Sequence, residues 1–79
     1  MTPTTGALEA ARAAYRASVD DHREAIQEYN AVIEMLDATP PGGADPAVLR
    51  QAYGLAVAVE QEAMIARREA LSELCRLMA

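Results

Sequence analysis

The feature that most constrains this chain of 79 residues is a stretch rich in proline and glycine near its middle, ATPPGGADP, from Ala38 to Pro46. No proline or glycine occurs from Ala7 to Ala38, and Gly54 is the only one between residues 47 and 78. Consecutive prolines end a helix because they lack an amide hydrogen and clash with the preceding turn, and glycines permit a sharp reversal. Helix connections of about two to eight residues generally join antiparallel neighbours. We therefore expect the stretch to be the turn of a helical hairpin.

The segment before this turn predicts an amphipathic helix over residues 7–38, because its apolar positions recur in steps of three and four. Val19, Ile26 and Ile33 widen this seam on one flank, and charged or polar residues cover the remaining surface. The seam consists of Leu8, Ala11, Tyr15, Ser18, His22, Ala25, Tyr29, Val32 and Leu36.

The segment after the turn predicts a second helix over residues 46–78. Asp45 is a favoured N-cap residue because its carboxylate accepts free amide hydrogens of the first turn. Pro46 suits the first helical position, where no amide hydrogen is needed. Gly54 costs roughly 1 kcal/mol relative to alanine but does not stop a helix. The sequence thus predicts one all-α domain over residues 1–79, an antiparallel, coiled-coil-like pair of helices joined by a turn at 39–45.

The second helix carries two apolar stripes where a hairpin has room to bury one. We expect the first stripe to pack against the first helix, through Val48, Leu55, Val59, Ala63 and Leu74. The second stripe would then face outward, and contiguous exposed apolar surface of this kind usually marks an interaction site. We expect the hairpin to complete its core with a second copy or with another protein. The predicted partner-binding residues are Leu49, Tyr53, Val57, Met64 and Leu71, with Tyr53 the foremost contact.

Composition argues against several other classes of protein. The net charge is -5, with seven arginines, no lysine and twelve acidic residues, whereas nucleic-acid modules concentrate positive charge. The longest apolar run, Ala52 to Val59, is far shorter than the roughly 20 residues of a membrane span. The opening residues, MTPTTGALEA, lack the basic and apolar parts of a secretory signal. We expect a cytoplasmic protein without a nucleic-acid or membrane partner.

The sequence also offers no arrangement that supports catalysis. His22 has no strong metal ligand three or four residues away, so we expect it to hydrogen-bond to a neighbour or to water. Cys75 has no nearby histidine to activate it, and we expect a buried or half-buried structural thiol. The carboxylates of the first helix lie on its polar side, without a pocket to shield one of them. We expect no catalytic, metal-binding or cofactor-binding residue, and no small-molecule substrate.

The second half of the chain resembles small helical-hairpin proteins of bacterial type III secretion systems. The likeness to the co-chaperones that hold needle subunits lies in GADP at 43–46, Arg50-Gln51, Leu55, AVEQ at 58–61 and Ile65. The needle subunit is the second choice, because ADPAVL at 44–49 is similar to its turn region. The chain lacks the needle subunit's tryptophan near the N-terminus and its polar second helix.

Two hypotheses follow from this reading. The resemblance implies a cytoplasmic co-chaperone whose second helix binds a helical partner. The alternative is a self-assembling structural protein, either a needle-type subunit or a homodimeric helical bundle. Neither hypothesis requires enzymatic activity.

Overall fold

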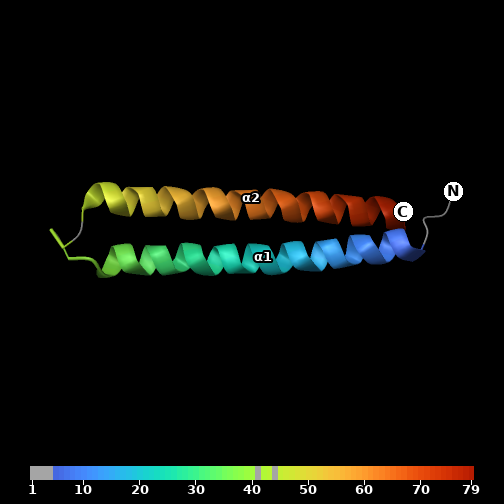
Figure 1. Cartoon of the computed structure of the whole chain (residues 1–79), viewed down its shortest axis with the longest axis horizontal. Helices are drawn as coiled ribbons and strands as arrows, with labels where there is room; N and C mark the ends of the chain where they lie inside the picture. Colours follow the sequence, from blue (N-terminus) through green and yellow to red (C-terminus); the bar gives the residue numbers. More distant parts are fainter. Residues whose placement is uncertain (1–4, 41, 44) are drawn as a thin grey trace.

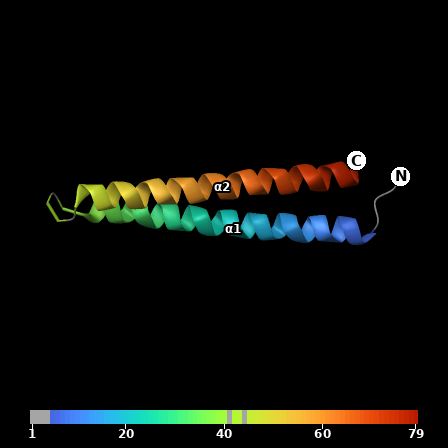
Figure 2. The same ribbon diagram turned by 45° about the horizontal axis from the view of Figure 1, so that its top comes forward.

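The computed structural model describes residues 5–40, 42–43 and 45–79, and it shows two long helices that run antiparallel (Figure 1). Helix α1 spans Thr5–Ala38 and helix α2 spans Pro46–Met78. The two views show them side by side along their whole length (Figure 2). The hairpin is a rod of 63 × 15 × 14 Å. The predicted all-α helical hairpin is confirmed, with α1 beginning two residues before the expected position.

The connection between the helices reverses the chain within a few residues. The Thr39 hydroxyl donates a hydrogen bond to the Met35 carbonyl at 2.6 Å, which satisfies one free acceptor at the end of α1. The Gly43 amide donates to the Pro40 carbonyl at 2.9 Å, which closes a four-residue turn. Gly42 has a φ of +80°, a conformation that glycine adopts without strain. Within the predicted turn at 39–45, positions 41 and 44 lie outside the described residues.

Helix α2 begins at the residues that the sequence indicated. Asp45 is the N-cap, and its carboxylate accepts a hydrogen bond from the Ala47 amide at 2.9 Å. Pro46 occupies the first turn, where an amide hydrogen would have no acceptor within the helix, so proline loses no hydrogen bond there. The predicted capping arrangement is therefore confirmed.

The interface between the helices follows a continuous alternation of three- and four-residue steps on both helices. Every predicted seam residue of α1, from Leu8 to Leu36, is buried or half-buried. The most deeply buried apolar side chains are Ala11, Ala25 and Ala56, whose small size lets the helices pack closely. The facing seam of α2 consists of Leu49, Tyr53, Ala56, Glu60, Ala63, Arg67, Ala70, Leu74 and Leu77.

This seam shows that the expected orientation of α2 is wrong. Val48, Leu55 and Val59 were expected to pack against α1, yet their exposed fractions are 60%, 61% and 46%. Ala63 and Leu74 do lie at the seam. The helix is turned because two charged residues, Glu60 and Arg67, belong to its inner stripe.

The five residues predicted to face outward therefore lie at or beside the seam. Leu49, Val57 and Met64 are half-buried. Tyr53 and Leu71 lie at its edge, with exposed fractions of 40% and 42%. Their position corrects the expected geometry, and their role in partner binding stays a prediction.

Candidate partner-binding face

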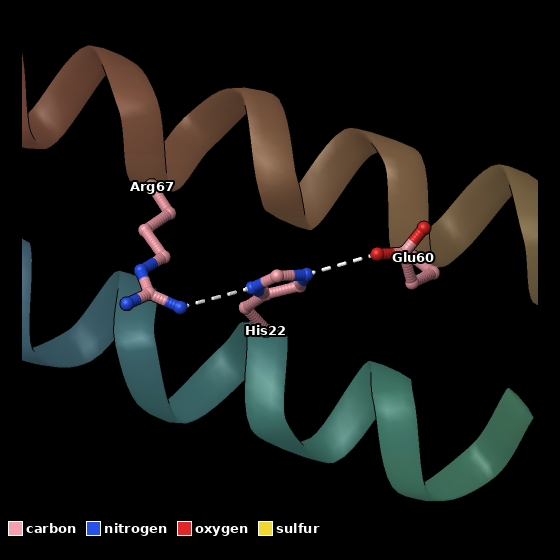
Figure 3. A network of polar contacts seen from close by, with 3 residues as sticks. All are labelled: His22, Glu60 and Arg67. Atoms are coloured by element: carbon pink, nitrogen blue, oxygen red, sulfur yellow. Dashed lines mark hydrogen bonds and ion pairs between the residues drawn. The ribbon is translucent and has the colours of Figure 1, made fainter. Parts of the chain in front are cut away.

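A trio of polar side chains crosses the seam near the middle of the rod (Figure 3). His22 of α1 is 8% exposed and lies between Glu60 and Arg67 of α2. Its Nε2 atom is 3.0 Å from a Glu60 carboxylate oxygen, and its Nδ1 atom is 3.4 Å from an Arg67 guanidinium nitrogen. Because arginine only donates hydrogen bonds, Nδ1 acts as the acceptor and Nε2 carries the proton that Glu60 accepts. The expectation that His22 is hydrogen-bonded to a neighbour is confirmed.

The polar trio fixes how the two helices align. Sliding α2 by one heptad would separate His22 from one of its partners and leave buried polar atoms unpaired, which is costly. A polar residue at an inner heptad position often specifies register in this way. The described residues include no group of three or more His, Cys, Asp or Glu side chains placed to hold a metal ion.

One broad side of the hairpin gathers half-exposed apolar side chains from both helices, and we call it the apolar face. Ile26 and Tyr29 of α1 line an open groove on this side together with Tyr53 and Val57 of α2. Two further grooves on the same side extend it, one beside Val19 and Arg67, the other beside Leu36 and Leu49. Residues seven or fourteen positions after these lining residues lie on the same side of their helix, so they belong to the same face. The apolar face consists of Val19, Ile26, Tyr29, Ile33, Tyr53, Val57, Met64 and Leu71.

Two tyrosines form the centre of this face. The ring centroids of Tyr29 and Tyr53 are 5.9 Å apart, with the planes inclined at 47°. A hydrogen bond with Tyr53 raises the pKa of Tyr29 above the ordinary value for tyrosine, and the nearby Tyr53 charge adds to this effect. The pair joins the two helices while leaving aromatic surface accessible, which suits a contact residue.

The opposite broad side has a different character, and we call it the acidic face. Its groove is lined by Asp21, Glu24 and Glu28 of α1 and by Glu62 of α2, around Val59 and three alanines. Val48 and Leu55 lie on the same stripe of α2 as Val59, so this face also exposes apolar side chains.

Two features of the site escaped prediction from the sequence. The flank of α1 formed by Val19, Ile26 and Ile33 was predicted to widen the seam, but not to form part of an exposed apolar face with α2. Cys75 is exposed, so the expected buried or half-buried thiol is wrong. Its position, eleven residues after Met64 and thus near the same flank of α2, places it outside the seam.

Comparison of the chain with protein-family models, with curated proteins and with solved structures found no match. Within the part of the chain that the structure describes, neither helix is long and apolar enough to cross a membrane.

Proposed function

We propose that this hairpin is a non-enzymatic, cytoplasmic protein-protein interaction module that binds an α-helical segment over its apolar face. The observation that carries the proposal is the incomplete core. None of the described large side chains is fully buried, and the buried apolar residues are three alanines. Larger apolar side chains lie instead at the edge of the seam, where a further helix would cover them.

The exposed area supports the same proposal. A compact monomer of 8.5 kDa exposes about 4,700 Å² of surface. This chain exposes 5931 Å². The difference exceeds the roughly 800 Å² that each partner buries in a standard interface. A helix docked along the groove between α1 and α2 would convert the two-helix rod into a three-helix arrangement with a closed core.

The resemblance of the second half to needle co-chaperones agrees with such a role, because those proteins hold a helical partner in the cytoplasm. Self-assembly is the second candidate function. The observation that favours it is the presence, on one chain, of both an apolar face and a separate acidic face that exposes Val48, Leu55 and Val59.

Site-specific photo-crosslinking in bacterial cells tests the proposal. A benzophenone amino acid replaces Tyr53 in one variant and Ala58 in the matched control, since Ala58 is exposed on the outer side of α2. We expect the Tyr53 position to give a discrete adduct, either with a helical segment of another protein or with a second copy. The Ala58 position should give none.

A second pair of variants checks that the adduct depends on the apolar face. Tyr53→Glu combined with Val57→Lys should abolish association while circular dichroism still shows a helical chain. Gln51→Glu combined with Ala58→Lys places the same charges on the outer side of α2, where both residues are exposed, and should change neither property. Equal adducts from both crosslinking positions, or association unchanged by the first pair, would contradict the proposed function.

A further inference from the structure

Charge is segregated between the two broad sides of the hairpin, and the arginines gather around the apolar face. Arg16 and Arg67 line one of its grooves, and Arg50 lines another. Arg12 and Arg23 lie about one turn before and two turns after Arg16, on the same flank of α1. Arg68 lies about five full turns after Arg50, on the same flank of α2. The apolar face is therefore rimmed by Arg12, Arg16, Arg23, Arg50, Arg67 and Arg68.

Acidic residues are fewer on this side of the molecule. Asp20 lines the same groove as Arg16, and Glu60 is engaged with His22. Glu9 lies about two turns before Arg16, and Asp37 lies about two turns after Asn30, which lines the central groove. The rim of the apolar face consequently carries net positive charge, although the chain as a whole has a charge of -5.

The acidic face has the reverse character. Four carboxylates line its groove, and no arginine is among the lining residues. Glu69 and Glu73 continue the stripe of Glu62 at about two and three turns beyond it. Arg76 pairs with Glu73 and lies two heptads after Glu62 on the same flank of α2, so this face carries one arginine against six carboxylates. Exposed Val48, Leu55 and Val59 lie on the same stripe of α2 as its carboxylates.

The two faces of one hairpin are thus complementary in charge, and both expose apolar side chains. Packing two apolar faces together would bring two arginine rims into contact, whereas an apolar face against an acidic face pairs opposite charges. The 63 × 15 Å outline of either face has a footprint of roughly 900 Å², comparable with the 800 Å² per partner of a stable interface.

We propose that the occupant of the apolar face is the acidic face of a second copy of this chain. The inference rests on the proposed function, since it requires the apolar face to bind helices. The contact is heterologous, because each copy uses a different face, and it leaves one face free at each end of the pair. Such contacts extend into open assemblies or close into rings.

Light scattering with size-exclusion chromatography across a dilution series tests this inference on the full chain. We expect the mass to rise beyond two chains from micromolar to millimolar concentration. Since salt screens rim charges, we expect association to weaken about tenfold between low and high salt concentration. A monomer at every concentration would overturn the inference, yet it would leave the proposed function intact if Tyr53 crosslinks to another protein.

Two complementary variants distinguish this contact from a symmetric dimer. Arg23→Glu with Ile26→Glu blocks the apolar face, and Leu55→Glu with Val59→Glu blocks the acidic face. Each variant alone should be monomeric. An equimolar mixture should form a pair of one copy each and stop there, because the two blocked faces are both acidic and repel one another.

Other outcomes contradict the inference. Self-association of the Leu55 and Val59 variant would show that two apolar faces pair symmetrically. A mixture that stays monomeric would show that the faces do not dock. If either variant loses helicity, Glu24→Gln with Glu28→Gln takes its place in the test, because this pair removes charge only from exposed positions. This milder pair should weaken association several-fold, and unchanged association would overturn the inference.

Discussion

Replacing Glu60 with alanine removes the acceptor of the buried His22 proton and measures how strongly the polar trio holds the helices together. The Nε2 proton of His22 points across the seam at the Glu60 carboxylate, 3.0 Å away. In Glu60→Ala this donor loses its partner inside the interface. An unsatisfied buried polar group costs about 1–3 kcal/mol. The Glu60 side chain is 27% exposed, so water reaches the site and the lower part of this range applies.

We therefore expect Glu60→Ala to lower the free energy of unfolding by about 1–1.5 kcal/mol, most of it the desolvation cost of an unpaired imidazole. For a chain of this size each kcal/mol corresponds to a fall of about 4–8 °C in the midpoint temperature. Replacing the whole trio, in His22→Leu with Glu60→Leu and Arg67→Met, leaves no polar group unpaired and fills the space with apolar atoms. Such replacements are often neutral or stabilising, and we expect this all-apolar variant to recover the midpoint.

Thermal unfolding followed by circular dichroism provides the measurement, with all variants at one protein concentration because association shifts apparent stability. Glu34→Ala is the matched control, since Glu34 is an exposed carboxylate that lies on neither face. A Glu60→Ala midpoint equal to that of Glu34→Ala would refute the reasoning. Equal destabilisation of Glu60→Ala and the all-apolar variant would refute it as well, because the loss would then not arise from an orphaned donor.

Two further predictions concern the helix interior and the tyrosine pair. Gly54 is exposed and an added Cβ would meet no atom within 4 Å, so Gly54→Ala should raise the unfolding free energy by about 1 kcal/mol in urea titrations. The pKa of Tyr29 is raised above 10.0 in the folded chain by its hydrogen bond with Tyr53, so the unfolded chain loses this proton first. Stability should therefore fall as pH rises from the ordinary tyrosine range through the raised pKa, and Tyr29→Phe should flatten this fall; an unchanged slope would contradict the assignment.

For helix α1 the sequence predicts both the helix and the face that it buries, because its apolar residues form a single stripe. The residues from Leu8 to Leu36 form an unbroken heptad seam, and charged residues flank it on the outer side. Helix α2 offers more apolar positions than one face can use, so its pattern allows two orientations. The correct one places Glu60 and Arg67 inside, which single-helix reasoning treats as solvent-exposed. Only their pairing with His22 across the seam makes these charges acceptable there.

The candidate site was harder to predict for a related reason. Tyr53 and Leu71 were identified correctly as accessible apolar residues of α2. Their neighbours Val19 and Ile26 come from α1, and which flanks of two helices meet depends on how the pair is turned. That choice is a property of the packed hairpin and is not encoded in the periodicity of either helix alone. A search for buried charges spaced to match His22 would have revealed it.

The antiparallel arrangement has a mechanical consequence. Figure 1 shows the start of α1 and the end of α2 at the same end of the rod, with the turn at the other. A force that pulls Thr5 and Met78 apart loads the layers of the seam one after another, beginning with Leu8 and Leu77, and opens the hairpin like a zipper. Tension between the turn and that shared end is instead carried by both helices in parallel along their axes. The same molecule is thus easily opened from its two helix ends and stiff along its length.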